Sequence, residues 1–349
     1  MRNPFKFGSV VTGQDFADRQ RELAELGREL SDGQHLFLLS PRRFGKTSLV
    51  LALLERLRSR GLLTAYVDVF RATSAPQLLE LLAQAVLAAA ETRPERLLRL
   101  ALDLLGRLRP QVGTDAAGRP TLTLDIGSSR RAPLALQEEV LALPQRLAAS
   151  RGRRLVVAFD EFQEIQRFPG AALERAMRSH FQGQDRVSYL FSGSKESLLR
   201  DMATRERSPF YKFGRTVSLG PIPPAEFLPF LAARFRRAGL RPGPGTLEAV
   251  IATADDVPYN VQRLCHQLWA MRAAPGRGAS PERLTEEDVA AALAAVVEQD
   301  SPHFGAAWDR LSLHQRRVLQ AIAQSGGTRM FAAEFLAAHR LGSHSSLQT

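Results

Sequence analysis

The sequence has almost no cysteine. Cys265 is the only one in 349 residues, which excludes an intramolecular disulfide and a zinc site built from cysteines. The chain also has no apolar run of membrane-spanning length, and residues 1–9 lack the basic and then apolar pattern of a secretory signal. We therefore expect a cytoplasmic protein with no membrane partner.

Lysine is scarce as well. Only four of the 47 basic residues are lysines, and the rest are arginines. The formal net charge of +11 would attract nucleic-acid backbones, but an arginine-rich compositional bias produces the same charge. The charge leaves both interpretations open, whereas Lys46 is notable because a compact point charge is kept where arginine is otherwise common.

Lys46 lies in a strand, loop and helix pattern. The apolar Leu36–Leu39 leads into a loop, and an amphipathic segment then continues to Arg60. In a P-loop, backbone N–H groups surround a phosphate, a lysine reaches its oxygens and a hydroxyl holds Mg²⁺. The residues predicted to bind nucleotide are Ser40, Pro41, Arg42, Arg43, Phe44, Gly45, Lys46, Thr47 and Ser48. Ser40 stands where the general motif has glycine, and we expect serine to be tolerated there.

A second buried strand ends in two carboxylates. Arg154–Phe159 is largely apolar and is followed directly by Asp160 and Glu161. Ligands of an open α/β sheet bind at the carboxyl ends of its strands. We expect Asp160 to hold Mg²⁺ with Thr47, and Glu161 to act as the general base that activates water. An ordinary Asp-Glu pair at a strand end is the alternative, and the upstream loop argues against it.

Two further strands end or begin with polar groups. Ser192 and Ser194 close the strand from Val187, where either could bond the γ-phosphate or attacking water, or simply cap a helix. Arg215 precedes a strand and could neutralise phosphate charge or lie in solvent. We assign Lys46, Glu161, Ser192 and Arg215 to the catalytic group.

Strands that alternate with helices predict one parallel sheet covered on both faces, with a hairpin inserted at 110–126. Pro144 is expected to interrupt or bend the helix at 134–150. The predicted domains are a P-loop domain at 1–221, a helical lid at 222–300 and a winged-helix-like segment at 301–349, with a break at Asp300–Pro302. The last segment contains two helices and the start of a third, which either read DNA or pack on the lid.

These motifs resemble the archaeal-type ATPases of the AAA+/STAND group, which also occur in bacteria. The resemblance rests on the following segments: Asn3-Pro4-Phe5, Phe16-x-x-Arg19, Pro41–Ser48, Phe159–Phe162, Ser192–Ser194 and Pro258-Tyr259-x-Val261-Gln262. It covers nearly the whole chain and implies a 5-1-4-3-2 sheet, a helical lid and a winged helix. The family often has a Gly-x-Pro turn in its lid, where this chain has Asp256-Val257-Pro258, and its winged helix continues through a third helix and a wing.

The sequence therefore predicts a Mg²⁺-dependent ATP-binding protein that hydrolyses ATP slowly and acts as a conformational switch. The alternative is a nucleotide-gated DNA-binding or scaffold protein in which hydrolysis is incidental. Assembly of a homo-oligomer on ATP, with Arg215 or another loop arginine acting across subunits, is a further expectation that the sequence leaves open. DNA would be a partner through the C-terminal segment.

Overall fold

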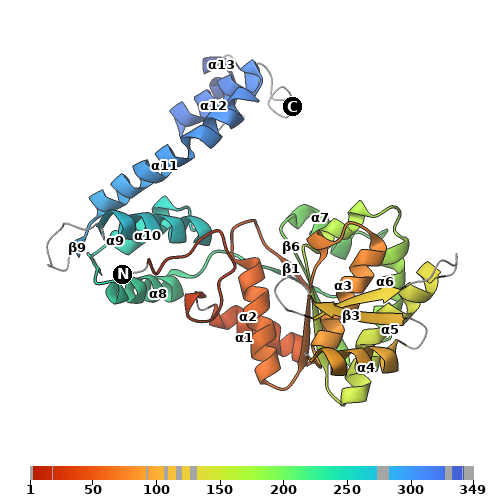
Figure 1. Cartoon of the computed structure of the whole chain (residues 1–349). Coiled ribbons are helices and arrows are strands. Elements are labelled where there is room, and N and C mark those ends of the chain that lie inside the picture. Colours follow the sequence, from red (N-terminus) through yellow and green to blue (C-terminus); the bar gives the residue numbers. More distant parts are fainter. Residues whose placement is uncertain are drawn as a thin grey trace. The chain divides into compact units, whose positions relative to one another are not determined.

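The computed structural model describes residues 3–17, 19–91, 93–105, 109–114, 120–125, 132–272, 283–326, 332–339 and 341. Its contacts divide the chain into two compact units, Met1–Thr285 and Glu286–Thr349 (Figure 1). None of the described helices is long and apolar enough to cross a membrane.

A five-stranded sheet forms the centre of the first unit. Its strands are β1 (Leu36–Leu39), β2 (Leu63–Asp68), β5 (Leu155–Asp160), β6 (Val187–Gly193) and β7 (Arg215–Ser218). The spatial order is β2-β5-β6-β1-β7, and all neighbours are parallel. Numbered within the sheet alone, this is the 5-1-4-3-2 order read from its other edge, so the predicted fold class is confirmed.

Helices cover both faces of this sheet because its inner strands are largely apolar and must be buried on both sides. Every residue of β1, β5 and β6 is buried, which is typical of strands covered on two sides. One face packs against α1 (Gln20–Ser31) and α2 (Lys46–Ser59). The other packs against a larger cluster from α3 (Ala75–Ala88), α4 (Pro94–Leu104), α5 (Ala132–Arg151), α6 (Ala172–Gln182) and α7 (Glu196–Thr204).

The predicted insertion is present as an antiparallel hairpin of β3 (Arg109–Thr114) and β4 (Pro120–Asp125). The predicted interruption of α5 is wrong. Pro144 lies inside one continuous helix, 12 residues after its start, because good helix formers such as leucine and alanine surround it on both sides.

Three helices follow the sheet within the segment predicted as a lid, and they are here called the lid: α8 (Pro224–Arg237), α9 (Thr246–Thr253) and α10 (Pro258–Arg272). A short parallel pair, β8 (Arg241–Pro242) and β9 (Arg283–Leu284), closes this part of the unit. Figure 1 shows residues 3–17, here called the arm, running from the P-loop side of the sheet to these helices.

The second unit contains α11 (Glu286–Asp309), α12 (Leu313–Ser325) and α13 (Ala333–Ala338). The predicted break at Asp300–Pro302 is wrong, because α11 continues through Pro302, with alanines on either side that favour helix. Ser312 begins α12 with a complete capping box. Ala321, Phe335, Leu336 and Leu341 form a small core. The predicted third helix falls largely outside the described residues, so the domain boundaries 1–221, 222–300 and 301–349 stay predictions.

Candidate nucleotide site

The P-loop connects β1 to α2 and is shaped by two residues with positive φ. Gly45, the N-cap of α2, has φ 80°, and Arg43 has φ 73°. Ser40 does not adopt this conformation, and its hydroxyl donates to the Pro41 carbonyl at 3.1 Å. The left-handed conformation that favours glycine therefore occurs at Gly45 and not at Ser40. This explains why serine is tolerated at position 40.

Asp160 is the most heavily bonded side chain of the site. It is 2% exposed at the end of β5. Oδ1 pairs with the Lys46 ammonium and accepts from Ser192 Oγ at 2.8 Å and the Glu161 amide at 3.0 Å. Oδ2 accepts from Thr47 Oγ1 at 2.7 Å and Tyr66 Oη at 3.0 Å. Burial raises the pKa of Asp160, but Lys46, Thr47 and Ser192 outweigh it and keep the pKa below its ordinary value.

Glu161 is also held at both oxygens. Its Oε1 lies 3.0 Å from Lys46 Nζ. Its Oε2 accepts from Gln163 Nε2 at 2.6 Å, and from the hydroxyl and amide of Ser194 at 2.8 and 3.2 Å. Burial pushes its pKa up, yet the ammonium and these donors lower the net value. Glu161 is therefore a carboxylate at neutral pH, but one with few free lone pairs.

The donor set of this cluster suits Mg²⁺. A magnesium ion prefers oxygen ligands, usually one or two from the protein with phosphate and water completing the shell. Thr47 Oγ1 and Asp160 Oδ2 are 2.7 Å apart at the start of α2, where the helix dipole and backbone N–H groups favour phosphate. A hydroxyl and a carboxylate beside a phosphate position fit a nucleotide-bound Mg²⁺.

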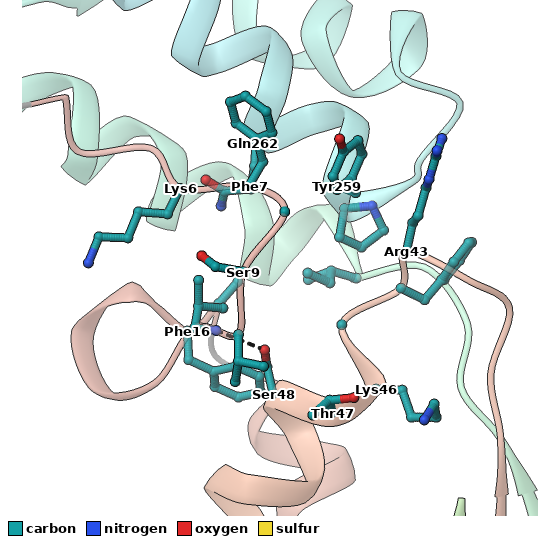
Figure 2. A pocket seen from close by; sticks show the side chains of 18 of the residues that line it. Lys6, Phe7, Ser9, Phe16, Arg43, Lys46, Thr47, Ser48, Tyr259 and Gln262 are labelled. Atoms are coloured by element: carbon teal, nitrogen blue, oxygen red, sulfur yellow. Dashed lines mark hydrogen bonds between the residues drawn. The ribbon is translucent and has the colours of Figure 1, made fainter. Parts of the chain in front are cut away.

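A cavity of about 480 Å³ lies beside the P-loop and extends to the arm and the lid (Figure 2). The predicted residues 41–48 all line it, together with Glu161 and Ser194. Its far end is more apolar, with Phe7 edge-on to Tyr259 at 5.8 Å between ring centroids. The Ser48 hydroxyl accepts a hydrogen bond from the Val11 amide at 3.0 Å, which is drawn as a dashed line in Figure 2.

The structure joins the P-loop to the lid directly. The Arg43 carbonyl accepts from the Tyr259 amide at 3.3 Å, and the Arg43 guanidinium lies 4.9 Å from the centroid of the Tyr259 ring. Asp256, which occupies the glycine position of the Gly-x-Pro turn, has φ 55° and so adopts the left-handed conformation that glycine would favour. Pro258 follows it and lines the cavity.

Arg215 does not reach this site within its own chain, so it is not the phosphate-neutralising group of this site that we expected, and a role across subunits stays a prediction. It pairs in register with Leu36, the first residue of β1, whereas the P-loop follows Leu39 at the opposite end of that strand. Its exposed guanidinium forms ion pairs with Glu25 and Glu29 of α1, both at 2.7 Å. The strand begins at Arg215 rather than ending there, and a parallel strand directs only its carboxyl end toward the site.

Ser192 is brought to the site but contacts Asp160 rather than open space. Tyr66 and Gln163 also belong to the site, although neither is predicted from the sequence. In the sequence, Tyr66 is the one tyrosine in the apolar strand predicted at 63–70, and Gln163 follows shortly after the two carboxylates. Both features mark polar side chains near predicted strand ends. Their partners could not be deduced without the fold.

The strand order adds a diagnostic detail, since β6 separates the P-loop strand from the carboxylate strand. With Lys46, Thr47 and Asp160 joined as described, this arrangement defines a P-loop nucleoside triphosphatase. A family model described as an ATPase domain predominantly from Archaea matches residues 16–262. The chain belongs to this family and is a P-loop ATPase.

Solved structures share the fold at low sequence identity. A Walker-type ATPase of Pyrococcus abyssi aligns with a TM-score of 0.60 and 17% identity over 99% of this chain and 93% of its own. The ORC2 protein of Aeropyrum pernix, in ADPNP and ADP complexes, gives 0.61 and 18% over 97% and 82%. The ORC1 protein of Aeropyrum pernix, in complex with DNA, gives 0.51 and 17% over 95% and 78%. No curated protein matches the chain.

Proposed function

We propose that this ATPase is Mg²⁺-dependent and turns over slowly, as a switch between nucleotide states. The observation that carries the proposal is the single cluster in which the Lys46 ammonium contacts both Asp160 and Glu161 while Thr47 bonds Asp160. The side chains proposed to contact phosphate, hold the metal and activate water all lie within this cluster.

Each residue has a distinct task in the proposed mechanism. The loop amides and Lys46 hold the phosphates, while Thr47 and Asp160 hold the metal. Bound Mg²⁺ neutralises charge on the phosphate oxygens. Lys46 would exchange its carboxylate partners for phosphate oxygens, and Glu161 would accept a proton from the water that attacks the γ-phosphorus as the bond to the leaving ADP breaks. Ser192, bonded to Asp160, keeps that carboxylate in place beside the phosphate position.

The bonding of Glu161 supports slow turnover. A general base needs a free lone pair within hydrogen-bond reach of the water. Glu161 Oε2 already accepts three hydrogen bonds and Oε1 faces Lys46, and its pKa is lowered, which makes it a weaker base. Hydrolysis then requires some of these bonds to break first, which suits a protein that persists in its ATP state.

The apolar end of the cavity supports base binding by the arm and the lid. Phe7 and Val10 come from the arm and Tyr259 from α10, so a base held there would contact both. Nucleotide occupancy would in this way be linked to the position of the lid, as a switch requires.

The test compares Lys46→Ala, Glu161→Gln and a control, Arg215→Ala. Lys46→Ala is expected to weaken ATP binding strongly, and Glu161→Gln to bind ATP but lose hydrolysis by roughly 100-fold or more. Arg215→Ala removes a charge at the other end of the sheet and should leave both unchanged. Wild-type hydrolysis by Glu161→Gln, or wild-type binding by Lys46→Ala, would contradict the assignment.

A second candidate function is nucleotide-gated DNA binding or scaffolding. The likeness to an ORC1 protein in complex with DNA supports it at the level of fold, as does the net charge of +11. The second unit, with α12 and α13 as the first helices of a winged helix, would supply the contact. DNA affinity that falls steeply with salt, together with negligible turnover, would favour this candidate.

Oligomer assembly distinguishes the switch from a further arrangement, a machine that works as an oligomer. Light scattering with and without ATP would show whether the protein assembles on nucleotide. Assembly coupled to faster hydrolysis would favour a machine in which an arginine acts across subunits, and a constant monomer would favour the switch.

A further inference from the structure

We propose that Tyr66 is a positioning residue that sets the affinity of the site for nucleotide-bound Mg²⁺ through Asp160. The inference rests on the proposed Mg²⁺ site and adds a residue to it. Tyr66 lies in β2, 94 residues before Asp160 in the sequence, and its hydroxyl donates to Asp160 Oδ2 at 3.0 Å.

The sheet explains how the phenol reaches the carboxylate. Strand β2 is the direct neighbour of β5, and their register places Tyr66 beside Ala158, two residues before Asp160. Alternate residues of a strand share a face, so Ala158 and Asp160 lie on the same face as each other. The Tyr66 ring packs on this face, against the cluster that includes α2, and its hydroxyl extends toward the strand end.

Five groups donate hydrogen bonds to Asp160, and nucleotide binding would break some of these bonds and keep others. Lys46 and Thr47 have second tasks, on phosphate and on metal, so their bonds to Asp160 are exchanged when nucleotide and Mg²⁺ enter. Ser192, the Glu161 amide and Tyr66 face no such exchange. The first two bond Oδ1, which leaves Tyr66 as the remaining donor to Oδ2 among the described residues.

Oδ2 is also the oxygen bonded to the Thr47 hydroxyl, so it belongs to the side of the carboxylate that faces the metal position. A donor that fixes a ligating carboxylate narrows its rotation and preserves its geometry for the ion. Removing such an outer partner typically costs 10- to 100-fold in metal affinity. Tyr66 therefore acts on the metal through Asp160 and need not touch the ion itself.

A purely structural role for Tyr66 predicts a different result, and Tyr189→Phe provides the matched control. Tyr189 is a fully buried tyrosine of β6 whose hydroxyl donates to Gln184 Oε1 at 2.6 Å in the cluster on the opposite face. Both Tyr66→Phe and Tyr189→Phe keep the ring and lose one hydroxyl bond. Only Tyr66→Phe removes a bond to the site.

The experiment measures the affinity of the full chain for the β,γ-imido analogue of ATP by calorimetry, first in EDTA and then across a Mg²⁺ titration. We expect Tyr66→Phe to match wild type in EDTA but to need roughly tenfold more Mg²⁺ for half of the affinity gain. Tyr189→Phe should follow the wild-type Mg²⁺ curve, and thermal unfolding should show similar small losses for both variants.

Three results would overturn the inference. One is a Tyr66→Phe curve with the wild-type Mg²⁺ midpoint, and another is an equal loss of affinity with and without Mg²⁺, which indicates a structural role. In both cases the increase of wild-type affinity with Mg²⁺ would still support the proposed metal site. If the affinity of the wild-type protein for the analogue did not depend on Mg²⁺, both the proposed metal site and this inference would be wrong.

Discussion

Glu161 illustrates how a residue that the sequence singles out can be more tightly bonded in the structure than its predicted role suggests. The adjacent carboxylates predict a metal ligand and a base, and the structure places both in the cluster with Lys46. Only the structure shows that Glu161 is restrained by Gln163 and Ser194. Gln163 is 3% exposed, packs against Gly193, and has an Oε1 atom with no hydrogen-bond partner among the described residues.

We predict that Gln163→Met speeds hydrolysis by roughly three- to tenfold, about the net value of one ordinary hydrogen bond. The substitution keeps the length of the side chain, removes the donor that occupies Glu161 Oε2 and removes the orphan carbonyl oxygen. Steady-state phosphate release at saturating ATP measures the effect.

Gln184→Met is the control, because Gln184 is a buried glutamine whose amide donates to the Leu141 carbonyl away from the site. It should leave the turnover rate unchanged. An unchanged or lower rate for Gln163→Met would mean that Gln163 orients Glu161 for catalysis rather than restraining it.

At the scale of elements, the arm is tied to the lid more firmly than to the sheet. Arg234 of α8 donates to the Pro4 and Gln14 carbonyls and pairs with Asp15 at 2.7 Å. His266 of α10 bonds the Phe5 carbonyl at 3.0 Å, and Phe5 packs on α8. Toward the P-loop helix, the Val11 amide of the arm donates to the Ser48 hydroxyl at 3.0 Å. The arm therefore moves with the lid if the lid moves.

We predict that Arg234→Met lowers ATP affinity by roughly tenfold, the equivalent of one charge-assisted hydrogen bond. A loosened arm must be ordered again when the base binds, and that ordering costs affinity. Pyrophosphate binds only at the phosphate end, so its affinity should stay unchanged. Calorimetry with both ligands measures the difference.

Arg237→Met is the matched control, since Arg237 lies on the same helix, is exposed, and makes one long bond of 3.4 Å to Gln14. It should bind both ligands as wild type does. If Arg234→Met weakened ATP and pyrophosphate equally, the arm would not be part of the base site.

At the scale of the whole molecule, the nucleotide site belongs to one unit. Every residue that lines the cavity lies between Lys6 and Gln262, within the unit that ends at Thr285. The strand β9 that pairs with β8 is also inside this unit. The second unit has its own small core, around Phe335 and Leu336.

We predict that a chain ending at Thr285 binds ATP with the affinity of the full chain, because it keeps all of the lining residues. Any DNA affinity should fall sharply in the same truncation, since the DNA-binding candidate assigns that contact to the second unit. Calorimetry with ATP and a fluorescence titration with duplex DNA at low and moderate salt measure the two effects. Loss of ATP binding in a folded truncation would show that the second unit completes the site.

The sequence by itself determined the ATPase class and the core of its site. Local patterns suffice there, because a phosphate loop and a strand ending in carboxylates are each continuous in the chain: Lys46, Thr47, Asp160 and Glu161 could be named from spacing alone. The resemblance supplied the strand order, which the structure confirms.

Only the tertiary structure decided which distant side chains join that core. The contact between Tyr66 and Asp160 spans 94 residues and the contact between Arg234 and Asp15 spans 219, and no local periodicity encodes either. Arg215 lies away from the site of its own chain for the same reason, since the end of a strand that faces the site depends on the direction of the strand in the sheet. Register and strand direction arise from the packing of the whole sheet, and they decide which of the chain's polar residues meet the nucleotide.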